Sequence, residues 1–128
     1  MNANLNASAV VPGITASDLE RSVYFYTDGL GFEVEEQNER DGKVVYVSLK
    51  AGGASIGLSR DDFAKGKDRV KGIGIRLWFQ TDTDLKLLAN RVKAAGFQLD
   101  AEPAPLPWGP LAFQLKDPDG IAITISNS

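Results

Sequence analysis

An arginine and a tryptophan in one apolar segment are the first residues of this chain that could do chemistry. Residues 73–79 read I-G-I-R-L-W-F. Isoleucine, leucine and phenylalanine alternate there with Gly74, Arg76 and Trp78, which is the pattern of a strand with one apolar face. An arginine fork can hold a carboxylate through two hydrogen bonds, and an indole can stack on a planar ring. We therefore interpret the second face of this strand as the floor of a binding pocket.

Strand alternation in the rest of the chain extends this pocket. We expect the apolar phase to face the helices: Val45, Val47, Leu49, Ile56, Leu58, Ile73, Ile75, Leu77, Leu111, Phe113, Leu115, Ile121, Ile123 and Ile125. The opposite phase is expected to face the pocket: Thr15, Val44, Tyr46, Ser48, Ser55, Ser59, Arg76, Trp78, Gln114, Lys116 and Thr124. The predicted ligand-binding residues are Tyr46, Ser48, Ser59, Arg76, Trp78, Trp108, Gln114 and Thr124.

Each of these side chains also has a structural interpretation. Arg76 could pair with an acidic residue of a neighbouring strand, namely Glu33, Glu35 or Glu36. Trp78 could pack in a dimer interface, where tryptophan is enriched. Tyr46 could lie on the sheet surface, and Trp108, in a proline-rich loop, could be a structural plug instead of a cover for the pocket.

Two residue types are missing, and their absence limits the chemistry. The chain contains no histidine and no cysteine. Histidine is the commonest metal ligand and the commonest general base near neutral pH, and cysteine supplies thiolate nucleophiles and disulfides. A metal site would have to be built from oxygen ligands alone.

Composition predicts a globular protein that binds neither nucleic acid nor membranes. The 128 residues are 43% hydrophobic and 24% charged, with a net charge of −3 and a pI of about 4.9. There is no basic patch for nucleic acid and no apolar run of the roughly 20 residues that span a membrane. No secretory signal is recognisable in the first residues, and disulfides are excluded, so we expect a cytoplasmic protein.

The predicted elements repeat, and each half contains a strand, a helix and three more strands. The first half has strands at 10–16, 32–38, 43–50 and 54–59, with a helix capped by Ser17 or Asp18 and ended by Gly29 and Gly31. The second half has strands at 73–79, 97–101, 111–116 and 121–126, with a helix from Asp82 or Thr83 to Ala95. Residues 103–110 are expected to form a rigid loop and 117–120 a simple turn. We predict one domain over 1–128, with modules at about 9–60 and 73–126 and a linker at 61–72.

Three sequence motifs within this repeat resemble the vicinal oxygen chelate superfamily of glyoxalases, extradiol dioxygenases and bleomycin-resistance proteins. They are D-L-E-R-S-V-Y-F-Y-T-D-G-L-G-F at 18–32, A-A-G-F at 94–97 and D-P-D-G at 117–120, and the resemblance covers 9–126. P-W-G at 107–109 and A-V-V-P-G-I-T-A-S-D at 9–18 look most like the bleomycin-resistance branch. The resemblance implies an α+β fold of paired βαβββ modules. Curved mixed sheets would surround a cleft, with the helices on the convex side.

The same resemblance allows the metal positions to be compared. In metal-dependent members the ligands come from the first and last strands of each module, and the matching positions here are Val11, Gly57, Gly74 and Thr124. Only the threonine offers a donor atom. We therefore expect no metal and no cofactor.

The sequence thus predicts a metal-free binding protein similar to bleomycin-resistance proteins, which are homodimers with clefts at the subunit interface. It would sequester an aromatic or antibiotic-like ligand as a homodimer, with a role in antibiotic resistance. Bleomycin is cationic and those clefts are acidic, so Arg76 and Lys116 argue against bleomycin itself. The alternative is a glyoxalase- or dioxygenase-like lyase or isomerase, either dependent on a metal or using Glu33, Glu35 or Tyr46 as a base. Whether the chain is an enzyme stays open, and the missing histidine and cysteine favour a binding protein.

Overall fold

Two βαβββ modules follow one another in the computed structural model, which describes residues 3–127. The first comprises β1 (Gly13–Ala16), α1 (Leu19–Tyr24) continued by a π-helical turn η1 (Phe25–Gly29), β2 (Glu33–Arg40), β3 (Lys43–Ala51) and β4 (Ala54–Arg60). The second comprises β5 (Arg76–Gln80), α2 (Leu85–Ala94), β6 (Ala101–Pro105), β7 (Leu111–Lys116) and β8 (Ala122–Ser126). The predicted internal repeat is confirmed.

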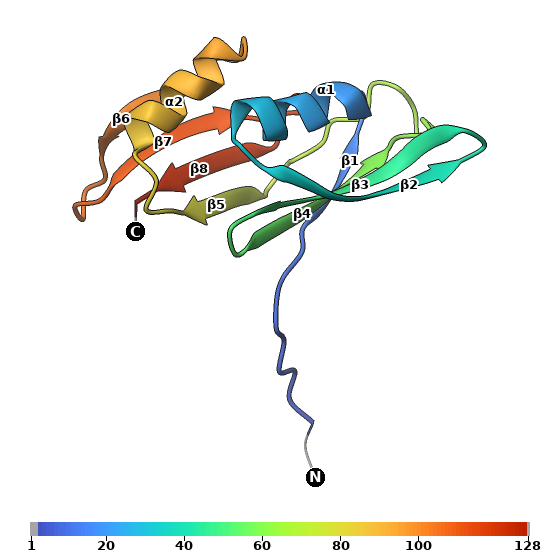
Figure 1. Cartoon of the computed structure of the whole chain (residues 1–128), viewed down its shortest axis with the longest axis horizontal. Helices are drawn as coiled ribbons and strands as arrows, with labels where there is room; N and C mark the ends of the chain where they lie inside the picture. The colour runs from blue at the N-terminus through green and yellow to red at the C-terminus, as the bar shows by residue number, and fades with distance from the viewer. Residues whose placement is uncertain (1–2, 128) are drawn as a thin grey trace.

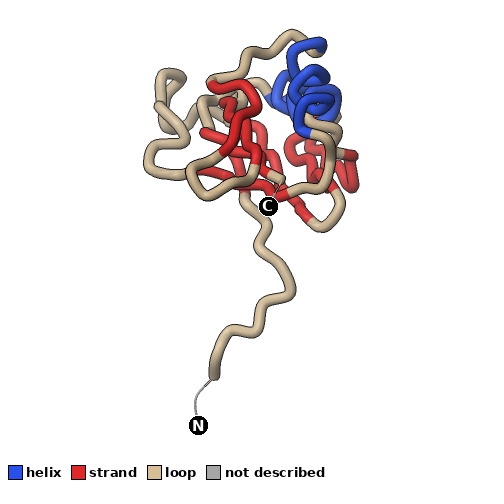
Figure 2. The backbone as a smooth tube through the Cα atoms, turned by 90° about the vertical axis from the view of Figure 1, so that its left-hand side faces the viewer, coloured by secondary structure: helices blue, strands red, loops and turns tan. Residues whose placement is uncertain are grey.

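Each module forms one mixed four-stranded sheet. The strand orders are β1-β4-β3-β2 and β5-β8-β7-β6. In each sheet the first-named pair is parallel and the other neighbours are antiparallel. Both helices lie on the same side of the two sheets, at the top of Figure 1, and the view in Figure 2 shows them gathered beside the strands. The predicted α+β fold is therefore confirmed.

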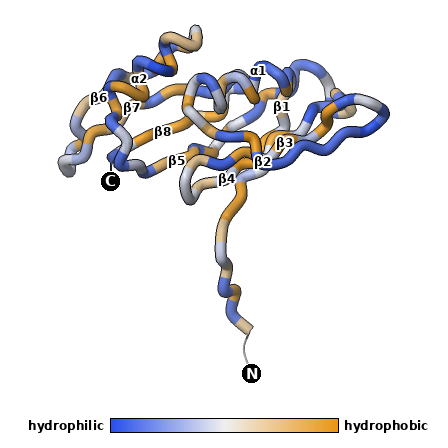
Figure 3. The backbone as a smooth tube through the Cα atoms, viewed as in Figure 1, coloured by the Kyte–Doolittle hydropathy of each residue, from blue (hydrophilic) through white to orange (hydrophobic). Residues whose placement is uncertain are grey.

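The core lies between the helices and the apolar phase of the central strands. Its fully buried strand residues are Leu49, Ile56 and Leu58 in the first module and Phe113, Leu115 and Ile123 in the second. The helices contribute Leu19, Phe25, Tyr26, Leu85, Ala89 and Val92. Figure 3 shows this apolar layer as orange segments in the central strands under both helices. Burial of these side chains supplies the main driving force for the fold.

The two isoleucines that open segment 73–79 do not face the helices as predicted. Ile73 is 80% exposed and Ile75 is 56% exposed, and β5 begins only at Arg76. Gly72 and Gly74 have positive φ angles of 76° and 75°, so the chain turns before the strand starts. Alternation is correct from Leu77 onward.

A β-bulge shifts the phase of β3. Tyr46 pairs with Asn38, but Val44 pairs with Glu39, so Val45 is an extra residue on its strand. Val44 consequently packs against the core, although it was predicted to face the pocket.

Both helices begin at an aspartate cap. Asp18 accepts a hydrogen bond from Arg21 N–H, as one of the two predicted caps. For α2 the cap is Asp84, not the predicted Asp82 or Thr83. Thr81 Oγ1 accepts the N–H of Thr83 at 3.0 Å, and this local turn delays the helix. Within residues 3–127, neither helix has the length and apolar character needed to cross a membrane.

The sixth strand lies later in the chain than predicted. β6 spans Ala101–Pro105 instead of 97–101 and takes in two of the prolines assigned to a loop. Proline is tolerated there because β6 is the outer strand of its sheet, next to β7 alone. The loop between β6 and β7 therefore covers only 106–110.

A buried hydrogen bond joins the two modules. Tyr26 Oη in η1 donates to Asp117 Oδ2 at 2.9 Å. The other carboxylate oxygen accepts the N–H groups of Asp119 and Ile121, each at 2.9 Å. Burial raises the pKa of Asp117, and the three hydrogen bonds oppose that rise. The turn at 117–120 is therefore also a contact between modules, which the sequence did not indicate.

A second polar cluster lies beside this bond. Lys71 Nζ donates to Ser17 Oγ at 2.6 Å and to Asp61 Oδ2 at 2.8 Å, and it lies 3.6 Å from Asp119 Oδ1. The Asp119 carboxylate also accepts the N–H of Ser17. Lys71 lowers the pKa of Asp61, its main partner in this cluster. The cluster ties the segment between the modules to both of them.

We expect the substitution Tyr26→Phe to lower the free energy of unfolding by about 1–3 kcal/mol at pH 7, because a buried carboxylate loses a donor. The raised folded pKa of Asp117 means that its contribution to stability is present at acid pH and lost as the pH rises through that pKa. Removing the Tyr26 hydroxyl raises this pKa further, so the loss should be larger at pH 7 than below pH 4. Urea denaturation at both pH values measures this difference.

Tyr24→Phe is the matched control. Tyr24 Oη donates to Ala95 O at an exposed position, so its removal should change stability by no more than about 0.5 kcal/mol. An equal loss for Tyr26→Phe at both pH values would contradict the role given to Asp117.

Candidate ligand-binding site

The second sheet places three of the predicted site residues in one row. Trp78 on β5 pairs with Thr124 on β8, and Thr124 pairs with Gln114 on β7. Arg76 lies two residues before Trp78 on the same face of β5. This face lies opposite the helices, because Leu77 and Phe79, which alternate with these residues, pack against the core.

Buried hydroxyl groups accept hydrogen bonds from the side chains of Arg76 and Trp78. Arg76 Nη1 donates to Thr124 Oγ1 at 2.8 Å, and Trp78 Nε1 donates to Ser126 Oγ at 2.8 Å. Ser126 was not predicted as a site residue, although it lies on the same face of β8 as Thr124. Since the indole N–H is already bonded, the face of the Trp78 ring is left to contact a ligand.

The second tryptophan lies next to the first. The ring centroids of Trp78 and Trp108 are 6.1 Å apart, with 36° between the ring planes. Trp78 is 47% exposed and Trp108 is 65% exposed, so Trp108 is not a buried plug. Hydrogen bonds from Leu106 N–H to Pro110 O and from Gly109 N–H to Leu106 O brace its loop. The two indoles form an open aromatic surface.

The remaining predicted residues lie on the first sheet. Tyr46 on β3 pairs with Ser59 on β4, which pairs with Thr15 on β1, and Ser48 pairs with Gly57. The Tyr46 ring covers Gly57 so closely that a Cβ added at Gly57 would collide with the Tyr46 hydroxyl. The predicted site residues therefore form two groups, one on each sheet. Between β1 and β5, the strands at the facing edges, lies a hollow of about 380 Å³.

Arg76 and Lys116, the two cations predicted to face the pocket, differ in their partners. Arg76 forms no ion pair with a carboxylate of residues 3–127, and Glu33, Glu35 and Glu36 lie on β2, the far edge of the other sheet. Lys116 pairs with Asp100 at 2.7 Å. We call the face of the second sheet that carries Arg76, Trp78, Gln114 and Thr124 the tryptophan face. Arg76 is the cation available on it.

Comparison with family models identifies this architecture. The model of the Glyoxalase/Bleomycin resistance protein/Dioxygenase superfamily matches residues 8–125. The chain belongs to this superfamily. No curated protein matches the sequence.

Several solved structures share the superfamily fold. TioX from Micromonospora sp. ML1 has a TM-score of 0.75 and 19% identity over 94% of this chain and 98% of its own. A glyoxylase/bleomycin resistance protein/dioxygenase domain from Frankia sp. EAN1pec has a TM-score of 0.76 and 25% identity over 94% and 90%. UcmS2 has a TM-score of 0.70 and 20% identity over 95% and 100%.

The superfamily's metal positions in this chain lack suitable donors. Gly57 and Thr124 lie on β4 and β8, whereas Val11 precedes β1. Gly74 lies in the turn before β5, so the residue beside Thr124 is Trp78 and not the predicted glycine. In residues 3–127, no group of three or more histidine, cysteine, aspartate or glutamate side chains is placed to hold a metal ion. The Tyr46 ring occupies the space that a ligand side chain at position 57 would need, so the residues present do not fit a metal.

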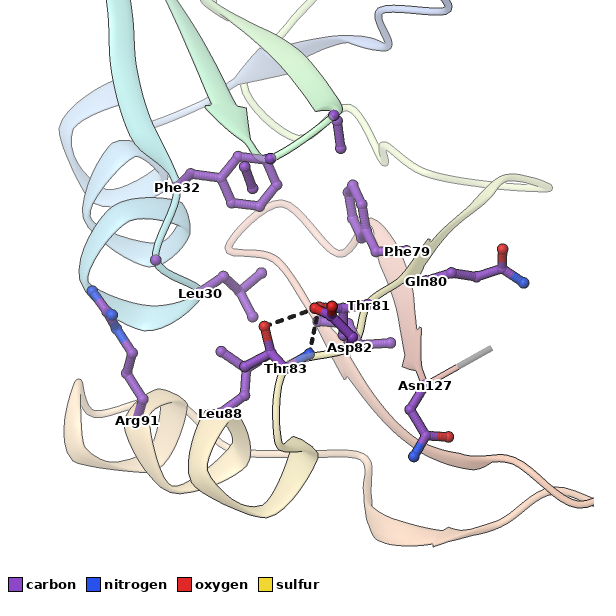
Figure 4. A pocket seen from close by; sticks show the side chains of 16 residues that line it. Leu30, Phe32, Phe79, Gln80, Thr81, Asp82, Thr83, Leu88, Arg91 and Asn127 are labelled. Atoms are coloured by element: carbon purple, nitrogen blue, oxygen red, sulfur yellow. Dashed lines mark hydrogen bonds between the residues drawn. The ribbon is translucent and has the colours of Figure 1, made fainter.

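A further hollow lies on the helix side, where the modules meet, and the sequence analysis did not predict it. Its volume is about 810 Å³, and it lies between the β3–β4 turn, residues 30–32 and the β5–α2 connection (Figure 4). We call it the junction hollow. The one sequence signal for it is the turn A-G-G-A at 51–54, which has almost no side chains.

We predict that the purified protein carries no stoichiometric metal. A bound ion would stabilise the folded state by mass action, so a chelator should leave the melting temperature unchanged if no ion is bound. Elemental analysis and thermal melts with and without EDTA measure this. One metal ion per chain together with a melting temperature that falls in EDTA would contradict it.

Proposed function

We propose that this protein binds a small aromatic molecule without a metal ion, as a sequestering protein of the bleomycin-resistance type. The observation that carries this proposal is the open pair of indoles, Trp78 and Trp108, with the Trp78 N–H already bonded to Ser126. A ring that is held in place before the ligand arrives loses little conformational entropy on binding. Indole faces gain most from stacking on planar, partly polar rings.

Arg76 favours a ligand with an acidic or carbonyl group. Its Nη1 donates to Thr124, which holds the guanidinium beside the row of Trp78 and Gln114. The remaining guanidinium donors can bind a carboxylate or carbonyl oxygen of a ligand stacked on the indole. A cationic ligand would be repelled at this point, so we do not expect bleomycin itself to be the natural ligand.

We further propose that the binding unit is a homodimer with a role in antibiotic resistance. The two groups of site residues lie on separate sheets of one chain, and a second copy could cover both. Residues 3–11 extend away from the body of the protein (Figure 1) and carry exposed Leu5, Val10 and Val11, which could pack on a partner. Bleomycin-resistance proteins, which this chain resembles, form their clefts at such an interface.

Catalysis by a carboxylate base has less support. Glu33 and Glu35 lie exposed on the outer strand β2, where the residue paired with Tyr46 is Asn38 and not a glutamate. We therefore propose binding and not lyase or isomerase activity.

Calorimetric titration with 1-naphthoate, an aromatic carboxylate, and with bleomycin tests the binding proposal. We expect 1-naphthoate to bind and Trp78→Ala to weaken it at least about tenfold, because loss of a stacked ring costs about 1.4 kcal/mol or more. Arg76→Met should weaken naphthoate binding as well. Leu87→Ala, an exposed change on α2, is the control and should leave affinity unchanged. Naphthoate binding that is indifferent to Trp78 and Arg76 would exclude this face as the site.

Sedimentation equilibrium tests the dimer. We expect a mass of twice the 13.8 kDa chain at micromolar concentration. Deletion of residues 1–11 should weaken association, because it removes the exposed apolar arm. A full-length chain that stays monomeric at high micromolar concentration would contradict the proposal.

A further inference from the structure

The junction hollow has the size and walls of a small-molecule site. Its volume of about 810 Å³ lies in the range of about 300–1,000 Å³ that is typical of ligand pockets. Phe32 and Phe79 meet edge to face on one wall, with ring centroids 5.6 Å apart, and Leu30 and Leu88 line another (Figure 4). Apolar walls of this kind favour a ligand with a ring or an aliphatic body.

The internal repeat provides a comparison for this hollow. In the second module the β7–β8 turn, 117–120, meets the connection from β1 to α1. There the Asp119 carboxylate accepts the N–H of Ser17 at 3.1 and 3.2 Å and lies 3.6 Å from Lys71 Nζ. The hollow left beside that turn is smaller, about 390 Å³. Hydrogen bonds and ion pairs of the chain's own charged side chains thus bridge this junction.

The matching junction in the first module is left open. Its β3–β4 turn, Ala51-Gly52-Gly53-Ala54, meets the connection from β5 to α2 without a polar side chain of its own. A Cβ added at Gly52 or Gly53 would meet no atom within 4 Å, so close packing does not require glycine there. The positive φ of Gly52, 57°, suits the turn, but Gly53 has no such constraint. The space in front of Gly53 is therefore free.

The two charged side chains that line the hollow have opposite charges. Asp82 brings one negative charge and Arg91 one positive charge. The Arg91 guanidinium is already engaged, because Nε donates to Asp28 O at 2.8 Å and Nη2 donates to Thr27 O at 3.1 Å. The hydroxyls of Thr81 and Thr83, 3.0 Å apart, lie beside the apolar walls and can bind a ligand oxygen. With one charge of each sign at the rim, a charged ligand gains no net attraction to offset its lost hydration.

We propose that the junction hollow is a second binding site, for a small neutral aromatic molecule that carries a carbonyl or ether oxygen. The ring lies against Phe32, Phe79 and Leu88, and the oxygen accepts a hydrogen bond from the Thr81–Thr83 pair. Phe79 and Trp78 are neighbours on β5 and project to opposite faces of its sheet. The junction hollow is thus separate from the tryptophan face and does not depend on the function proposed for that face.

Titration of ¹⁵N-labelled full-length protein with acetophenone, a neutral aromatic ketone, tests this site. We expect saturable shifts of the backbone amides of Gly52, Gly53, Thr81 and Thr83 at millimolar ketone. Binding of the ketone at Trp78 is read separately, from the shift of the indole N–H. Benzoate, a charged analogue, should shift these amides at least severalfold more weakly. Absence of saturable shifts at these four amides, or equal binding of benzoate, would overturn the proposal.

Gly53→Phe is the variant that fills the hollow, and it should abolish the saturable shifts. Gly13→Phe is the matched control, because an added Cβ at Gly13 also meets no atom within 4 Å but lies on β1, away from the hollow. Trp78→Ala should leave the saturable shifts at Gly52, Gly53, Thr81 and Thr83 unchanged, because Trp78 does not line the junction hollow. If Gly53→Phe does not fold, the proposal is tested by the amide shifts of the unaltered protein alone. A folded Gly53→Phe variant that still binds acetophenone at these amides would refute the assignment.

Discussion

The relative placement of the two modules depends on the hydrogen bond between Tyr26 and Asp117. It connects the end of the first helix to a turn of the second sheet, 91 residues further along the chain. Both groups are buried, and Tyr26 is the one of the carboxylate's three donors that comes from the other module, so loss of this bond would remove a donor from a buried carboxylate. The Lys71 cluster reinforces the same junction. Both helices lie on one side of the two sheets, so they leave the opposite faces of the sheets uncovered (Figure 1).

Under the proposed function, the tryptophan face would recognise its ligand without a metal ion. At the positions where metal-dependent relatives place ligands, this chain has a glycine covered by Tyr46 and a threonine that orients Arg76. Aromatic rings and fixed hydrogen-bond donors therefore occupy the places of acidic or imidazole ligands. Recognition would then depend on ring stacking and on one guanidinium instead of coordination bonds.

Local patterns explain which parts of the fold were predictable. The alternation of β5, β7 and β8 correctly places Trp78, Gln114 and Thr124 on one face. The errors arise where another effect overrides the local pattern. A bulge turns Val44 toward the core, where Val45 was predicted. Turns at Gly72 and Gly74 make β5 begin at Arg76, after Ile73 and Ile75.

Contacts between distant segments could not be predicted from sequence patterns. The Tyr26–Asp117 bond and the junction hollow both form between the modules, and neither produces a periodic signal. Ser126 was not predicted for a different reason. Its hydrogen bond with Trp78 Nε1 depends on the orientation of the indole, which a sequence pattern does not give. The shared face of Trp78, Gln114 and Thr124 was thus predictable, but the separation of the predicted site residues onto two sheets, the hydrogen bonds and the second hollow required coordinates.

The composition of the outer strands has a consequence for solubility at high concentration. β6 carries Pro103 and Pro105, which cannot donate to a further strand, and β2 is rich in exposed glutamates along E-V-E-E-Q-N-E-R. Both outer edges are therefore poor templates for growth of the sheets into aggregates. The unpaired edges of β1 and β5 are short, at four and five residues, and lie within the molecule. This chain should remain dispersed at concentrations where proteins with long, bare strand edges form fibrils.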